Sequence, residues 1–240
     1  MTRILHLDAS ARPGRYGTES HGSHTRNLTH RFISRWLKFR PNDEVIYRDI
    51  GAKPPGAICG DWIQAAFSSS ENAEPWMEKV LAESNELVDE LIQSDILVLG
   101  IPMYNFNVPS AFKAWIDNIV RIGRTFEFDP NLEIPYIPLL ADRPRRVVLL
   151  SSRGGYDMGP GGALAHMNHL EPSVQTALGF IGLTEIDCIA VEYQEEGGEH
   201  LTQSVKDAEI RVDRLVDELL SGPASTDREP SNMEPVYSEI

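Results

Sequence analysis

Apolar residues recur along this chain in two alternating patterns. Residues 96–101 and 147–150 are continuous apolar runs, which are typical of strands covered on both faces. Other stretches carry apolar residues three or four positions apart, as at Leu28, Phe32 and Trp36, and this spacing predicts amphipathic helices. The patterns predict five strands, at 3–7, 44–49, 95–101, 145–151 and 185–191, and five helices, at 25–39, 75–93, 109–122, 166–180 and 204–220.

Strands and helices therefore alternate over residues 1–220, which predicts a single α/β domain with right-handed crossovers. Five strands of this kind predict a doubly wound parallel sheet in the order 2-1-3-4-5. In that order the chain reverses direction between strands 1 and 3, and ligands bind above the carboxyl ends of the strands at that point. The loops 8–24 and 102–108, with 152–158 beside them, are therefore the expected site.

Three segments do not fit this scheme. Residues 51–74 form a long connection rich in Pro, Gly, Ser and Ala. Residues 127–144 contain four prolines, so that this segment cannot be a regular helix. Long connections in compact domains are usually functional or mobile. Residues 221–240 are polar and without periodicity, and we expect a disordered tail.

Charge and cysteine content narrow the class of protein. The 240 residues carry a formal net charge of −14, which disfavours binding to nucleic acid. Two cysteines, Cys59 and Cys188, cannot make a disulfide framework, and no Cys/His spacing indicates zinc. His166 and His169 lack a third convergent ligand, so we expect no metal. No apolar run has the length of a membrane span, and a cytoplasmic location is expected.

The first loop is rich in glycine and hydroxyl groups and leads into a predicted helix. Unpaired backbone N–H groups and the helix dipole favour an anion at such an end. A phosphate is expected against Ser10, Ser23, His24 and Thr25. The alternative is that Ser23 or Thr25 only caps the helix.

The second loop reads Pro102, Met103, Tyr104, Asn105 and Phe106. Apolar flat side chains beside an amide suit a flavin ring, which needs stacking on its faces and polar groups at one edge. The alternative is a turn whose aromatic side chains merely cover the core.

The third loop contains Ser152, Arg153, Gly154 and Gly155. Paired glycines let the backbone approach a ligand closely. The alternative is an ordinary strand-to-helix turn, which would also contain such glycines. All three candidate groups fall on the loops that the topology selects, and this agreement favours a ligand site over three unrelated turns.

Several spaced motifs together resemble a known family. They are PMYNF at 102–106, FKAWID at 112–117, RIGRTF at 121–126, SRGG at 152–155 and LGFIGL at 178–183. Over residues 2–220 the chain resembles the FMN-dependent NADH azoreductases, which are quinone reductases of flavodoxin-like fold.

The resemblance implies a homodimer that holds FMN noncovalently, takes hydride from NADH or NADPH, and reduces quinones, azo compounds or nitroaromatics. By matching position, Ser10, Ser23, His24 and Thr25 would hold the phosphate. The stretch from Met103 to Phe106 would line the ring and ribityl chain, and the stretch from Ser152 to Gly155 would follow the pyrimidine edge.

The chain departs from the family in three places. Its first loop is longer, His24 stands where an amide is commoner, and residues 127–144 follow another pattern, so that they are expected to wall the substrate pocket. Tyr156 and His166 are candidates for protonating a substrate, and Arg12, Arg15 and Arg153 for a 2′-phosphate. A single-electron carrier or redox sensor of the same fold, or an enzyme specialised for one metabolite, are the alternatives.

Overall fold

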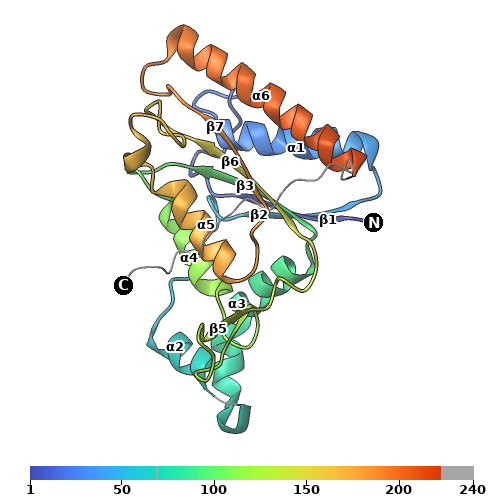
Figure 1. The fold of residues 1–240 in the computed structure, drawn as a ribbon, viewed down its shortest axis with the longest axis vertical. Coiled ribbons are helices and arrows are strands. Elements are labelled where there is room, and N and C mark those ends of the chain that lie inside the picture. The colour runs from blue at the N-terminus through green and yellow to red at the C-terminus, as the bar shows by residue number, and fades with distance from the viewer. Residues whose placement is uncertain (69, 223–240) are drawn as a thin grey trace.

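A five-stranded parallel sheet lies at the centre of the protein in the computed structural model, which describes residues 1–68 and 70–222 (Figure 1). The strand order is β2-β1-β3-β6-β7, and the register places Leu99 between Leu7 and Leu149. The predicted α/β fold with a five-stranded parallel sheet is confirmed. The strands are β1 (Arg3–Asp8), β2 (Glu44–Asp49), β3 (Ile96–Pro102), β6 (Arg146–Ser152) and β7 (Ile186–Val191).

Helices cover both faces of this sheet (Figure 1). On one face, α1 (His24–Phe39) and α6 (Gly198–Ser221) pack against the sheet. Phe32 of α1 and Val212 of α6 are buried there together with the side chains on that face of the strands. On the other face, Trp115 and its neighbours form the larger core. The helices of that face are α3 (Pro75–Gln93), α4 (Ser110–Ile119) and α5 (Leu170–Phe180).

The middle strand explains the continuous apolar run in the sequence. Every residue of β3 is buried, because β1 and β6 flank it and helices cover both of its faces. Gly100 has no room for a side chain: a Cβ there would lie 2.5 Å from Asp8 Oδ1 of β1 and 2.8 Å from Thr29 Cγ2 of α1. A glycine is therefore required for α1 to pack across the end of this strand.

Two regions contain structure that the sequence pattern did not predict. The connection 51–74 includes α2 (Gly60–Phe67) and the short 3₁₀ turn η1 (Ser70–Asn72). Within 127–144 there is no regular helix, as predicted, but β4 (Phe126–Phe128) and β5 (Tyr136–Pro138) form a separate antiparallel hairpin. The hairpin is anchored by ring contacts of Phe126 and Tyr136 with Phe180 of α5, at 5.0 and 5.2 Å.

Several helix ends also differ from the prediction. Helix α6 begins at Gly198, six residues earlier than expected; this residue and the preceding N-cap, Gly197, both have positive φ. Helix α5 begins only at Leu170, because Asn168 Oδ1 accepts a hydrogen bond from the Leu170 backbone and 165–167 form the 3₁₀ turn η2 (Ala165–Met167). Ser221 is the last residue of α6, so the prediction that the disordered tail begins at 221 is wrong at this residue. Residues 223–240 of the predicted tail lie outside the described residues. Within the described residues, no helix combines the length and apolar character needed to cross a membrane.

The central strand supplies a test of the core. Leu99 is fully buried, so Leu99→Ala should lower the free energy of unfolding by roughly 2–5 kcal/mol through lost burial and a cavity. The matched control is Ile210→Ala on the exposed side of α6, with an expected change within about 0.5 kcal/mol. Urea denaturation of both proteins measures this. Equal effects would contradict the assignment of β3 to the core.

Candidate functional site

The three loops predicted from topology meet at the carboxyl edge of the sheet. The Met103 backbone N–H donates to the Ser152 carbonyl at 2.8 Å, which joins the second loop to the third. The Ala11 N–H donates to Tyr104 Oη at 3.1 Å, which joins the first loop to the second. Backbone and side-chain hydrogen bonds thus hold the candidate groups in one surface.

Helix α1 begins at this surface. Ser23 is its N-cap: Ser23 Oγ accepts from the Arg26 N–H at 3.3 Å and lies 3.0 Å from Thr25 Oγ1. The capping role considered from the sequence is therefore real. It leaves the backbone N–H groups of His24 and Thr25, in the first turn, without intrahelical acceptors. The Ser10 hydroxyl is buried beside them and accepts from the Arg12 N–H at 3.2 Å.

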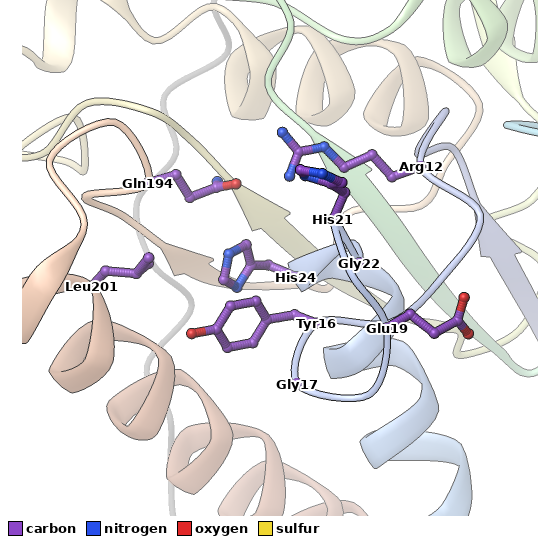
Figure 2. A pocket seen from close by; sticks show the side chains of 9 residues that line it. All are labelled: Arg12, Tyr16, Gly17, Glu19, His21, Gly22, His24, Gln194 and Leu201. Atoms are coloured by element: carbon purple, nitrogen blue, oxygen red, sulfur yellow. The ribbon is translucent and has the colours of Figure 1, made fainter.

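The His24 imidazole is buried and stacked on Tyr16, with 3.9 Å between ring centroids. Its Nδ1 has no hydrogen-bond partner among the described residues. Burial, and then the nearby Arg12 guanidinium, lower the pKa of His24 to about 4, so the ring is neutral near pH 7. Figure 2 shows the ring between Gln194 and Tyr16, in a cavity of about 300 Å³ that Arg12 also lines.

Arg26, which is not among the site residues predicted from the sequence, organises the first loop. Its guanidinium is buried, with Nε donating to the Arg12 carbonyl at 2.7 Å and Nη2 to the Ser10 carbonyl at 2.8 Å. Two further bonds, of 2.6 and 2.8 Å, reach the Asp49 carboxylate. A signal existed, because Asp8 follows the first predicted strand and Asp49 ends the second, and carboxylates at adjacent strand ends favour a nearby cation.

The second loop has a conformation that displays its side chains. Asn105 and Phe106 have φ values of 48° and 70°, in the left-handed region that L-residues seldom adopt. Tyr104 and Asn107 exchange backbone hydrogen bonds of 2.9 and 3.1 Å around them. Pro102 is buried as the last residue of β3, and Met103 packs against the core. Tyr104 and Phe106 remain 38% and 46% exposed, so the alternative that both aromatic side chains merely cover the core is wrong.

The third loop is held from behind by two carboxylates. Ser152 and Arg153 are buried, and the Arg153 guanidinium lies 3.4 Å from Glu171 and 3.3 Å from Glu192. The carbonyls of Gly154 and Gly155 accept from the backbone after β7. The Arg153 side chain is thus engaged inside the protein.

Glu171 also affects a neighbouring thiol. It accepts a hydrogen bond from Ser151 Oγ at 3.0 Å. Burial, and then the Glu171 charge, raise the pKa of Cys188 to about 11. Neither Glu171 nor Glu192 was identified from the sequence. Glu171 lies in a predicted helix and Glu192 directly follows a predicted strand, and neither belongs to a motif.

The two protonation candidates lie at the rim. Tyr156 is exposed and stacks on Tyr193, with 4.8 Å between centroids. His166 is exposed in η2. Neither side chain makes a hydrogen bond within the described part of the chain, and no group of three or more potential metal ligands is found in that part.

Comparison with known proteins shows similarity over nearly the whole chain. A family model described as a flavodoxin-like fold matches residues 2–216. The FMN-dependent NAD(P)H:quinone oxidoreductase 1 of Pseudomonas aeruginosa is 42% identical over 214 residues, which are 88% of this chain and 97% of that protein. The FMN-dependent NADH:quinone oxidoreductase 2 of Colwellia psychrerythraea is 36% identical over 221 residues, which are 92% of this chain and all 100% of that protein.

Solved structures agree in fold. The azoreductase of Bacillus anthracis str. Sterne superposes with a TM-score of 0.78 at 21% identity, covering 91% of this chain and 100% of that one. At this identity the likeness is one of fold. The resemblance drawn from the spaced motifs is confirmed by the family model and by the full-length relatives, and the chain belongs to the FMN-dependent NADH azoreductase family of flavodoxin-like fold.

Proposed function

We propose that this protein is an FMN-dependent NAD(P)H oxidoreductase that reduces quinones and azo compounds in two-electron steps. One observation carries the proposal: the loops after β1, β3 and β6 converge at the start of α1. The chain that makes this arrangement is 36% and 42% identical to proteins named as FMN-dependent quinone oxidoreductases.

The start of α1 fits the phosphate of FMN. Ser10, Ser23, His24 and Thr25 would hold it through hydroxyl groups, the two free N–H groups and the unpartnered His24 Nδ1. The first turn of α1 has no acidic residue, so the positive end of the helix dipole is uncompensated there. A buried polar atom without a partner is costly in an empty site, and a phosphate oxygen would satisfy it.

The other two loops fit the flat ring. Met103, Tyr104 and Phe106 offer apolar contacts, and the positive φ at Asn105 presents its amide and backbone at the loop surface. Ser152, Arg153, Gly154 and Gly155 would follow the ring edge through their backbone, since the Arg153 side chain is held by Glu171 and Glu192. Pro102 would set the direction in which this loop leaves β3.

Bound there, FMN would supply the redox chemistry, taking a hydride from NADH or NADPH and releasing two electrons to the acceptor in a second, ping-pong half-reaction. The protein would orient the ring through Asn105 and exclude water from it with Tyr104 and Phe106. A quinone takes its protons from solvent. For azo compounds, Tyr156 and His166 are the side chains we propose as proton donors.

We also propose that the enzyme is a cytoplasmic homodimer. The β4–β5 hairpin exposes a group of large apolar side chains, which favours burial against another chain. The hairpin packs on Phe180, the last residue of α5, and in Figure 1 it lies away from the carboxyl edge of its own sheet. A second copy would therefore be needed for the hairpin to wall a substrate pocket. The exposed side chains are Phe128, Leu132, Ile134, Tyr136 and Ile137.

A single-electron carrier is the second candidate. The exposure of Tyr104 and Phe106 in one chain would leave a flavin edge open to a partner protein, and the net charge of −14 suits docking to a basic one. Steady NADH oxidation with a quinone separates the candidates, because a carrier would show little turnover without its partner.

The first test is a visible spectrum of the protein after addition of FMN and desalting, followed by anaerobic NADH or NADPH. Retained flavin bands that bleach, with turnover of a quinone, are expected. Asn105→Leu removes the amide and disfavours the backbone, and should lower turnover by ~10-fold or more, whereas Asn105→Gly keeps the backbone and should lose ~2- to 10-fold, the value of one hydrogen bond. A protein that retains no flavin would contradict the cofactor assignment.

Arg26 supplies a test of the phosphate loop. Arg26→Met leaves the Asp49 carboxylate unpaired and frees the carbonyls of Ser10 and Arg12, so the free energy of unfolding should fall by roughly 3–5 kcal/mol. The dissociation constant of FMN should rise at least ~10-fold. Arg31→Met is the control, because Arg31 forms a half-exposed ion pair with Asp213, worth at most about 1 kcal/mol. Equal FMN affinity in the two variants would remove Arg26 from the site.

His24 predicts a pH dependence of the apoprotein. Its folded pKa of about 4 lies below the ordinary histidine pKa of 6.5, so the unfolded chain binds the proton first as the pH falls. Stability is therefore full above pH 6.5 and falls as the pH drops toward 4, by roughly 3 kcal/mol in total. Denaturation at a series of pH values should show that His24→Gln loses this part of the slope while His200→Gln, at an exposed position of α6, keeps it. The same slope in both variants would contradict the assignment.

A further inference from the structure

A second cavity, of about 450 Å³, lies between α2 and α3, apart from the three loops. Its wall combines apolar side chains, Ala65, Met77 and Leu81 among them, with polar ones such as Asn85. Arg121, which follows the end of α4, also lines it. Nothing in the proposed redox reaction uses this cavity.

Arg121 differs from the other buried arginines. Arg26, Arg145 and Arg153 each lie within ion-pair distance of a carboxylate, whereas Arg121, which is only 6% exposed, has no such partner within residues 1–68 and 70–222. Burial, and then the nearby Arg124 charge, lower the pKa of Arg121. The cavity therefore has a buried cation in its wall, and no carboxylate of the described residues, Glu74 and Glu78 of the same wall included, lies within ion-pair distance of it.

The contacts of Arg121 use only some of the hydrogen-bond donors of its guanidinium. Nη1 donates to Ser84 Oγ at 2.7 Å and to Asn85 Oδ1 at 3.4 Å, and the group lies over the Trp62 ring, 5.4 Å from its centroid. Nε is buried without a hydrogen-bond partner, and no hydrogen bond of Nη2 is found among the described residues. A role limited to joining α2 and α3 would explain these contacts and leave the buried Nε donor unpaired, at a cost in free energy.

We propose that this cavity binds a small monocarboxylate with an apolar body, the carboxylate pairing with Arg121 and the body lying on Ala65, Met77 and Leu81. A guanidinium presents a planar fork that matches a carboxylate. Glu74 and Glu78 line the same cavity and repel additional negative charge, which disfavours inorganic phosphate and dicarboxylates. The proposal does not depend on the identity of the flavin or of the electron acceptor.

The test is calorimetric titration of the FMN-loaded protein with benzoate, with benzyl alcohol and inorganic phosphate as comparison ligands. Arg121→Gln removes the charge, and Ala73→Phe fills the exposed rim of the cavity while leaving Arg121 in place. Arg124→Gln is the matched control, because Arg124 lies on the same turn, pairs with Asp89 and is not part of the cavity wall. The flavin spectrum is recorded at each addition to detect binding beside the ring.

We expect benzoate to bind in the micromolar to millimolar range, at least ~10-fold more weakly in Arg121→Gln and in Ala73→Phe, and unchanged in Arg124→Gln. Benzyl alcohol and phosphate should bind at least ~10-fold more weakly than benzoate, and the flavin spectrum should not change. Absence of binding to about 10 mM benzoate in a folded protein would overturn the proposal. Equal binding by Arg121→Gln, or a benzoate-dependent change in the flavin spectrum that accounts for all the heat, would also overturn it.

Discussion

The arrangement of the loops at the carboxyl edge of the sheet depends on the hydrogen bonds of one buried group, the Arg26 guanidinium. It joins the end of β2, through Asp49, to the carbonyls of Ser10 and Arg12. Arg26 stands in the first turn of α1, so the same residue sets the loop against the helix start. The hydrogen bond from the Ala11 N–H to Tyr104 Oη then fixes the second loop against the first. The surface is organised before any ligand arrives, which lowers the entropy lost on binding.

Much of the fold could be predicted because burial on both faces leaves a strong mark in a sequence. The β3 and β6 strands are continuous apolar runs, and α1 and α3 show clear helical spacing. The β4–β5 hairpin could not be predicted from periodicity, because each strand has three residues and β5 ends in a proline. The early start of α6 depends on positive φ at Gly197 and Gly198, which the sequence allows but does not require.

The candidate site was found by topology more than by motif. Parallel strands bring distant loops to one edge, so Ser10, Met103 and Ser152 could be grouped before their contacts were known. The supporting residues could not, because Glu171 and Glu192 act only through their position behind the third loop. Arg153 illustrates the limit: the sequence shows a cation beside two glycines, and only the structure shows that its side chain faces inward.

The half-buried thiol of Cys188 has a consequence for a protein that is proposed to carry reducing equivalents. With a pKa of about 11, only about one molecule in 10⁴ carries the thiolate at pH 7. Oxidation by peroxide proceeds through the thiolate, and peroxide forms whenever a reduced flavin leaks electrons to dioxygen. Burial, and after it the Glu171 carboxylate that supports the third loop, thus keep the sulfur in its least reactive form, and the enzyme would tolerate its own by-product at this position.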